Sequence, residues 1–181
     1  PDGGRVLFSS ERPKPDGVTT KGEIWYVEKS ANGWSAPIYL DTSINDGWAM
    51  FVTCSNDNTL YFTGGYAGKY GLFKSELVDG EYVKPEYLPE EINSNGGAHP
   101  FIAPDESYLL FDAQPTGRGK TDLYVSFNIE GKWQKAIKLP ESINLTKTEG
   151  IARVSPDGRF IFFHRQNDIY WVSAGILEQL K

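Results

Sequence analysis

Short apolar runs separated by turn-forming residues follow one another along this chain. The stretch 99–140 shows such runs between groups of Pro, Asp, Gly and Asn residues, and the runs begin at Phe101, Leu109, Leu123 and Trp133. Apolar and polar residues alternate within them, which is typical of β-strands with one buried face. The stretch therefore predicts a meander of four antiparallel strands.

The same pattern recurs about every 50 residues, a period typical of repeat architectures. Each repeat begins with a turn whose central residue is Asp2, Asn56, Asp105 or Asp157. An apolar triplet follows each turn, at 6–8, 60–62, 109–111 and 161–163. We expect the triplets to be buried second strands, with Phe8, Phe62, Phe111 and Phe163 between neighbouring sheets.

Three further landmarks follow each triplet in a constant order. The third strand comes after an acidic residue at Glu23, Asp122 and Asp168, with Gly71 in the second repeat. An aromatic residue marks the fourth strand, at Trp34, Tyr82 and Trp133. An Ile-Asn pair ends the repeat, at 44–45, 92–93 and 143–144. We expect the acidic residues to form hydrogen bonds with a neighbouring turn.

These landmarks resemble those of the TolB-like β-propeller family, which is WD-repeat-like and built on Pro-Asp-Gly repeats. The resemblance rests on the turn at 155–159, the Asp-Ile-Tyr at 168–170, and the order of Trp, Leu-Pro and Ile-Asn. It covers nearly the whole chain and implies an all-β fold of four-stranded antiparallel blades around a central tunnel. The second repeat departs from it at 55–57 and Gly71, and the third at Glu106.

The repeats predict a partial ring of about 3.5 blades. Its blades are placed at 1–47, 48–97, 98–150 and 151–181. The first blade lacks its first strand and the last blade lacks its fourth, so we expect either a single domain or the C-terminal part of a longer propeller. Residues 175–181 predict a brief helical turn. Open edges of this kind predict that the isolated chain aggregates or dimerises edge to edge.

Charge and composition exclude several classes of partner. The chain has 18 basic and 24 acidic residues, a net charge of −6 and 39% hydrophobic residues. This balance argues against binding of nucleic acid or of an anionic membrane surface. No apolar run reaches the roughly 18 residues that span a bilayer. The single Cys54 cannot form a disulfide within the chain.

No catalytic or metal-binding motif is present in the sequence. The Asp and Asn residues of the turns are interpreted as backbone hydrogen-bond acceptors rather than as reactive carboxylates. The chain contains two histidines, His99 and His164, which are too few for a histidine-rich metal cage. We therefore expect neither a metal nor a cofactor.

One face of the propeller is predicted to carry the function. The connection between strands two and three varies most in length, at 9–22, 63–71, 112–121 and 164–167, and such variation usually marks a binding face. This face collects the side chains predicted to bind a ligand, Arg12, Trp48, Tyr66, His99, Arg118, Glu149 and His164.

Two functions remain open at this stage. The resemblance favours a non-catalytic propeller of the bacterial envelope, periplasmic or exported, that binds a protein, peptide or glycan at the tunnel mouth. The alternative is a carbohydrate-active propeller enzyme, a polysaccharide lyase or glycoside hydrolase, in which His99, Glu149 and His164 act as acid, base or metal ligands. Convergence of any two of these side chains within about 5 Å in a concave pocket, with perturbed protonation, would favour the enzyme.

Overall fold

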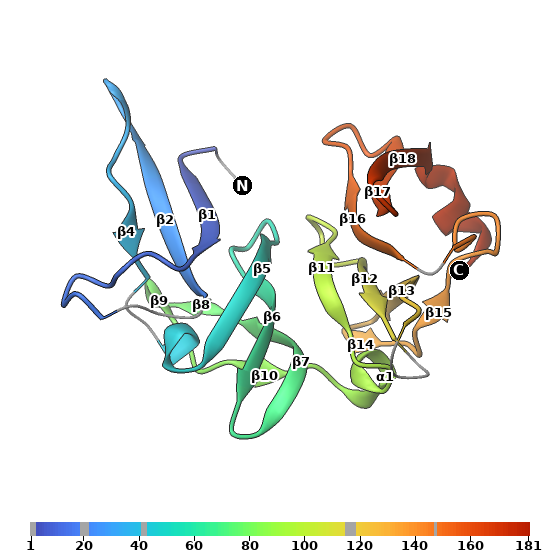
Figure 1. The fold of residues 1–181 in the computed structure, drawn as a ribbon, viewed down its shortest axis with the longest axis horizontal. Helices are drawn as coiled ribbons and strands as arrows, with labels where there is room; N and C mark the ends of the chain where they lie inside the picture. Colours follow the sequence, from blue (N-terminus) through green and yellow to red (C-terminus); the bar gives the residue numbers. More distant parts are fainter. Residues whose placement is uncertain (1–2, 19–21, 41–42, 115–118, 147) are drawn as a thin grey trace. The chain divides into compact units, whose positions relative to one another are not determined.

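The computed structural model describes residues 3–18, 22–40, 43–114, 119–146 and 148–181. The chain divides into two compact units, Pro1–Tyr87 and Leu88–Lys181. Each unit contains two antiparallel sheets of three or more strands that follow one another in the sequence, and the first unit also contains a two-stranded hairpin (Figure 1). The all-β fold of antiparallel propeller blades, predicted from the repeats, is confirmed.

The first unit begins with a sheet that holds strands two to four of a blade. Its strands are β1 (Arg5–Ser10), β2 (Glu23–Ser30), β3 (Gly33–Trp34) and β4 (Ile38–Tyr39), with β3 and β4 both paired to β2. A 3₁₀ turn, η1 (Ser43–Asp46), leads to the second sheet. That sheet has the order β10-β7-β6-β5 and consists of β5 (Trp48–Cys54), β6 (Leu60–Tyr66), β7 (Lys69–Ser75) and β10 (Glu86–Tyr87). A small hairpin of β8 (Leu77–Val78) and β9 (Glu81–Tyr82) lies between β7 and β10 in the sequence.

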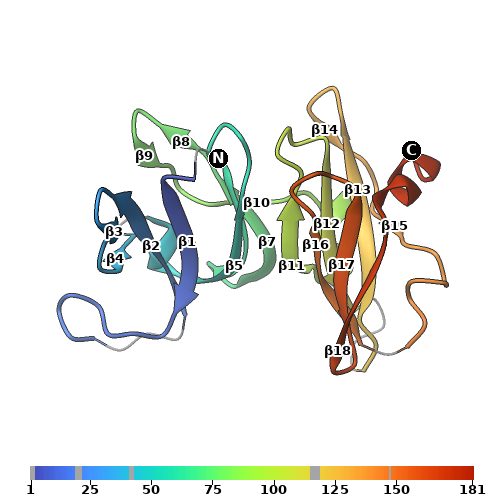
Figure 2. The same cartoon turned by 90° about the horizontal axis from the view of Figure 1, so that it is seen from above.

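The second unit opens with the single turn α1 (Glu90–Asn93) and a complete blade. The blade consists of β11 (Ala98–Ile102), β12 (Tyr108–Ala113), β13 (Asp122–Ile129), β14 (Lys132–Trp133) and β15 (Ile137–Lys138). The last sheet, of order β16-β17-β18, lies beside it (Figure 2) and consists of β16 (Glu149–Val154), β17 (Phe160–Arg165) and β18 (Asp168–Ser173). The predicted terminal helical turn is the 3₁₀ helix η2 (Ala174–Gln179). Within the described residues the last sheet has no fourth strand, as the sequence predicted.

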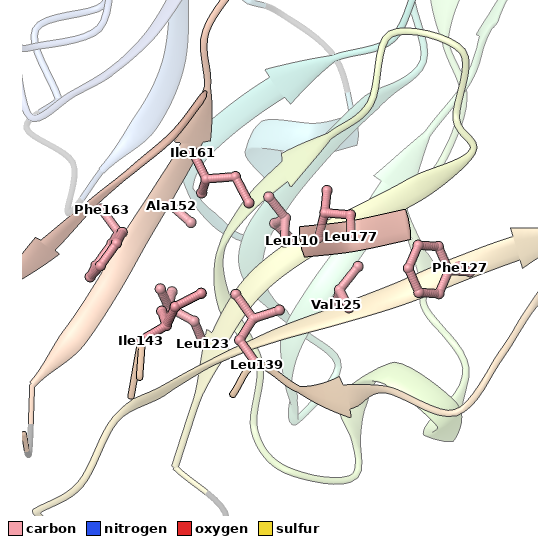
Figure 3. Close-up of a cluster of buried hydrophobic side chains, with 10 residues drawn as sticks. All are labelled: Leu110, Leu123, Val125, Phe127, Leu139, Ile143, Ala152, Ile161, Phe163 and Leu177. Atoms are coloured by element: carbon pink, nitrogen blue, oxygen red, sulfur yellow. The ribbon is translucent and has the colours of Figure 1, made fainter. Parts of the chain in front are cut away.

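The apolar triplets form much of the core. In the second unit Leu110, Ile161 and Phe163 pack with residues of β13 and with Leu177 of η2 (Figure 3). Phe62, Phe111 and Phe163 are buried, as predicted, whereas Phe8 is only half-buried. Val6, the first residue of its triplet, and Phe162, the middle residue of its triplet, are exposed, contrary to expectation. Successive side chains of a strand point to opposite faces of its sheet, so Val6 lies opposite Leu7 and Phe162 lies opposite Ile161 and Phe163, which pack in the two cores.

The Ile-Asn pair closes each blade through hydrogen bonds. Asn144 accepts from the backbone N–H of Leu123 at 2.7 Å and donates to the carbonyls of Leu123 and Leu139 at 3.1 and 2.8 Å. In the first unit Asn45 makes the same three bonds, to Ile24 and Leu40. A buried amide therefore ties the third strand to the segment that follows the fourth.

The turn carboxylates are structural, with one correction. Asp157 accepts from the Ser155 hydroxyl at 2.6 Å and from the Arg159 N–H at 3.1 Å. In the second repeat the same bonds, to Ser55 and Thr59, belong to Asp57 and not to Asn56, which the sequence predicted as the central residue. The register is shifted because Asn58, with φ +69°, takes the left-handed position that Gly158 holds with φ +72°.

Two of the three acidic residues before the third strands pair with lysines. Lys14 Nζ lies 3.0 Å from Glu23 Oε1, and Lys138 Nζ lies 3.1 Å from Asp122 Oδ2. Asp168 is exposed and accepts from the N–H of Ile169. The expected recurring hydrogen bond to a neighbouring turn is therefore replaced by an ion pair at Glu23 and Asp122 and by a bond from the next residue at Asp168. A buried carboxylate needs a counter-charge, which a lysine supplies more completely than a turn amide.

The predicted nine-residue connection at 63–71 is also wrong. β6 and β7 pair as far as Tyr66 and Lys69, so the turn consists of Ala67 and Gly68 alone. The glycines that suggested a loop instead make room for aromatic rings. A Cβ on Gly64 would lie 2.8 Å from the Tyr66 ring, and a Cβ on Gly65 would lie 2.7 Å from the Tyr70 ring.

Candidate functional site

A pocket with several polar side chains lies in the second unit, between the blade of β11–β15 and the sheet of β16–β18. Its volume is about 440 Å³. Residues of β11, β12, β16 and β17 and of the neighbouring segments line it, and the polar ones include His99, Asp112, Thr121, Thr148, Glu149 and His164. The three residues that the sequence proposed as alternative catalytic groups therefore line one pocket.

Asp112 is the organising residue of this pocket. Its side chain is 3% exposed, and its two carboxylate oxygens lie 2.8 and 2.9 Å from Nδ1 of His99. A carboxylate only accepts, so Nδ1 of His99 carries the proton. Asp112 Oδ2 also accepts from the backbone N–H of Ile151 at 3.2 Å. One carboxylate thus holds a side chain of β11 and the backbone of β16.

His99 and Ile151 occupy equivalent bulges in the first strands of their sheets. The register shifts between Ala98 and Phe101 in β11, and between Gly150 and Arg153 in β16. Both residues have left-handed backbone, with φ +49° at His99 and +55° at Ile151. Such a bulge adds one residue to the strand and redirects its side chain.

The first unit contains a bulge of the same kind. Phe51 of β5 has φ +57°, and its N–H donates to the hydroxyl of Ser9, in β1, at 3.0 Å. Ser9 and Asp112 each follow the apolar triplet of their repeat directly. The second strand of one blade therefore fixes the bulge of the next blade with the first polar side chain after its core residues.

Gly150 is required by the position of the Asp112 carboxylate. A Cβ on Gly150 would lie 2.3 Å from Asp112 Oδ2, well inside van der Waals contact. Arg153 lies on the other side of the bulge and donates to the carbonyl of His99 at 3.4 Å. Burial lowers the pKa of Arg153, and the negative charge of Asp112 opposes this shift. The pocket is thus closely built around one carboxylate.

Glu149 forms its hydrogen bonds with Arg165 and Thr146. It is fully buried, and its Oε1 accepts from Arg165 Nε at 3.1 Å and from the N–H and hydroxyl of Thr146, each at 2.7 Å. Arg165 also donates to the carbonyl of Ile143 and lies over the ring of Tyr170. Glu149 therefore joins β16 to β17 and to the segment before β16.

His164 also lines the pocket. It is half-buried and pairs with Gly150 across the β16–β17 ladder. It directly follows the triplet of the fourth repeat, the same position as Asp112 in the third. Among the described residues no group of three or more His, Cys, Asp or Glu side chains is placed to hold a metal ion.

Three predicted ligand contacts lie in the first unit. Arg12 donates to the Ser10 hydroxyl at 3.0 Å and lies over the ring of Trp25. Trp48 begins β5 and pairs with Gly65. The Tyr66 hydroxyl donates to the carbonyl of Ile44, and burial raises the pKa of that hydroxyl. Arg118 lies outside the described residues.

Asp112 and Ile151 were not among the site residues predicted from the sequence. The available signal was the position directly after the apolar triplet, where Ser9, Thr63, Asp112 and His164 are all polar. No sequence pattern singled out Ile151, because isoleucine is a common residue near the start of a strand.

Comparisons with known proteins bear on the fold. No family model and no curated protein matches the sequence. A protein assigned as TolB from Agrobacterium tumefaciens has a similar structure, with a TM-score of 0.60 and 15% identity over 94% of this chain and 57% of that chain. A puromycin-hydrolysing peptidase from Mycobacterium tuberculosis has a TM-score of 0.53 and 14% identity, over 94% of this chain and 36% of that chain.

These likenesses are at the level of the fold. They confirm that the chain has a TolB-like β-propeller fold, as the repeat landmarks predicted. The chain spans little more than half the length of the first protein and about a third of the second. No helix in the described part of the chain is long and apolar enough to cross a membrane.

Proposed function

We propose that this chain is part of a non-catalytic propeller that binds a protein, peptide or glycan in the pocket of the second unit. The observation that carries the proposal is the double contact of Asp112, which fixes both the His99 ring and the Ile151 bulge. A site whose side chains are already held in place loses little conformational entropy when a ligand binds.

The size and chemistry of the pocket support this function. A volume of about 440 Å³ is within the range of small-ligand and side-chain pockets. Hydroxyl, imidazole and carboxylate groups are the donors and acceptors that read a peptide backbone or sugar hydroxyls. His99 and His164 are proposed as direct contacts, and Glu149 as a support of the pocket wall.

The contacts of the two buried carboxylates favour binding over catalysis. A general acid or base must reach the proton that it transfers. Glu149 is fully buried and its Oε1 is engaged by Arg165 and Thr146. Asp112 is engaged by His99 and by the backbone of Ile151.

One observation keeps a carbohydrate-active enzyme as a second candidate. A carboxylate bonded to Nδ1 orients an imidazole in the way that general-base histidines require. His99 and Asp112 have this arrangement. In that function, as a polysaccharide lyase or glycoside hydrolase, His99 would be the base, with His164 in the same pocket.

The TolB-like fold also supports a place for the protein in the periplasm or outside the cell. Ligand binding by Arg12, Trp48, Tyr66 and Arg118 stays a separate proposal, because the first three lie in the first unit and Arg118 lies outside the described residues. The net charge of −6 makes nucleic acid an unsuitable partner.

The test is a binding screen of the protein against a peptide library and a glycan array, followed by His99→Asn. Asparagine tolerates left-handed backbone and its amide can donate to Asp112, so the fold should be retained. We expect His99→Asn to weaken binding about tenfold or more. The control is Glu130→Ala, in an exposed turn away from the pocket.

Three outcomes separate the possibilities. Binding that His99→Asn weakens and Glu130→Ala leaves unchanged supports the proposal. Release of new reducing or unsaturated sugar ends by the parent, lost in His99→Asn, would establish the enzyme instead. Binding that is unaffected by His99→Asn would show that the functional surface lies elsewhere.

A further inference from the structure

Ile151 has an unusual backbone conformation. Its φ of +55° lies in the left-handed region, where a β-branched side chain is strongly disfavoured. Among the described non-glycine residues with positive φ it is the β-branched one, and the equivalent bulges hold Phe51 and His99. Left-handed backbone with such a side chain persists only where surrounding contacts impose it.

The contacts that impose this backbone are known. The N–H of Ile151 is held by Asp112 Oδ2, and Gly150 leaves room for that carboxylate. A glycine at position 151 would make the same bond without strain, because glycine adopts left-handed backbone readily. Gly131 and Gly158 have this backbone in turns of this chain. The bulge therefore accounts for the backbone but not for the isoleucine side chain.

Burial does not account for the side chain either. Ile151 is 44% exposed, and it lines the pocket together with His99. A strained, exposed, apolar side chain at a pocket contributes little to folding. Outliers of this kind cluster at ligand-binding positions.

We propose that Ile151 is the specificity-determining residue of the pocket, and that it selects a peptide segment with an apolar side chain. This inference rests on the proposed function and names its ligand class. His99 supplies hydrogen bonding, and Ile151 supplies an apolar contact to the neighbouring side chain of the same peptide.

The lining of the pocket favours a peptide over a glycan. Sugar rings present flat C–H faces, which proteins commonly cover with aromatic side chains. None of the described residues that line this pocket is Trp, Tyr or Phe. A branched aliphatic contact beside hydrogen-bonding groups is suited to an aliphatic side chain and the adjacent peptide group.

The probe is a positional-scanning peptide library in which one position is fixed in turn as Ala, Val, Leu, Phe, Asp or Lys. A glycan array is screened in parallel. The variants are Ile151→Gly and Ile151→Asp, because both residues accept left-handed backbone. Glu130→Gly is the matched control, since it relieves a φ of +52° in an exposed turn outside the pocket.

The parent protein is expected to prefer peptides with Val or Leu at the fixed position. Ile151→Gly should bind these about tenfold more weakly while its melting temperature is equal to or higher than that of the parent. Ile151→Asp should reverse the preference toward Lys. Glu130→Gly should leave both affinity and preference unchanged.

The outcomes that overturn the inference differ from those that overturn the proposed function. Peptide binding that His99→Asn weakens but neither Ile151 variant changes would refute the role of Ile151 alone. Binding of glycans and not of peptides would refute the peptide class and retain the pocket. A lower melting temperature in Ile151→Gly with unchanged affinity would show that Ile151 has a structural role. Binding of neither library would overturn both proposals.

Discussion

Arg165 and Glu149 form an ion pair in the interior of the second unit, with Arg165 Nε 3.1 Å from Glu149 Oε1 and the Glu149 side chain fully buried. The pair joins the first strand of the last sheet to its second strand. A carboxylate that sequence alone suggested as an acid or base is therefore part of the framework that shapes the pocket.

Removal of one partner of this pair should strongly destabilise the protein. We expect Glu149→Ala to lower the free energy of unfolding by about 3 kcal/mol, because Arg165 would remain as an uncompensated buried charge. Urea denaturation measures this loss. The double variant Glu149→Leu with Arg165→Met should recover much of it, and equal losses in the single and double variants would contradict the interpretation.

Gly150→Ala tests the space around Asp112. The added Cβ would meet Asp112 Oδ2 at 2.3 Å, so either the carboxylate or the bulge must move. We expect a loss of about 2 kcal/mol in stability and weaker ligand binding. Gly175→Ala in η2 is the control, since its Cβ would meet no atom closer than 3.4 Å. Equal effects of the two substitutions would show that the Asp112 site tolerates the methyl group.

Low pH should lower the stability of the protein, because it protonates the carboxylate of Asp105 in a turn. Hydrogen bonds from the Ser107 hydroxyl and N–H lower the pKa of Asp105 in the folded state. A lowered folded-state pKa gives a contribution to stability that is complete above the unfolded value of about 3.9 and is lost as the pH falls below it. Urea midpoints measured between pH 5 and pH 2.5 should fall less steeply in Ser107→Ala than in the parent. Ser142→Ala, in an exposed position, should keep the parental slope.

Asn144→Ala should be among the most damaging single amide substitutions. It would leave the N–H of Leu123 and the carbonyls of Leu123 and Leu139 without their partner in a buried site. Unpaired buried groups cost about 1–3 kcal/mol each, so a total loss of about 3 kcal/mol is expected in thermal or urea denaturation. Asn167→Ala, in an exposed turn, should cost less than about 0.5 kcal/mol.

The exposed edge of the last sheet should promote self-association. Within the described residues β18 pairs with β17 alone, and its Ile169 is 72% exposed. Ile169→Lys should shift the protein toward monomer in sedimentation velocity, because a charged edge resists strand pairing. Ile129→Lys, at another exposed isoleucine, should not. A parent protein that is monodisperse and monomeric would contradict this prediction.

The fold could be predicted from the sequence because the landmark residues have the same structural role in successive repeats. The triplets 60–62 and 109–111 fill the core, and Asn45 and Asn144 make the same hydrogen bonds in two blades. Tasks of this kind recur at a fixed spacing, so they can be recognised without a structure.

The candidate site was harder to predict from the sequence, because its main residues differ in type from one repeat to the next. Asp112, Ser9 and His164 share a position but differ in chemistry. The strain at Ile151 comes from a bulge, which depends on pairing between strands and leaves no mark in composition. Gly64 and Gly65 misled the loop prediction because glycine serves both turns and the close approach of aromatic rings.

Asp112 belongs to the same strand as Leu109, Leu110 and Phe111, which are completely buried. Core strands of this kind open only in global unfolding. A ligand held through His99 and Asp112 should therefore slow amide hydrogen exchange throughout β12, in proportion to its concentration, and not only at the rim of the pocket.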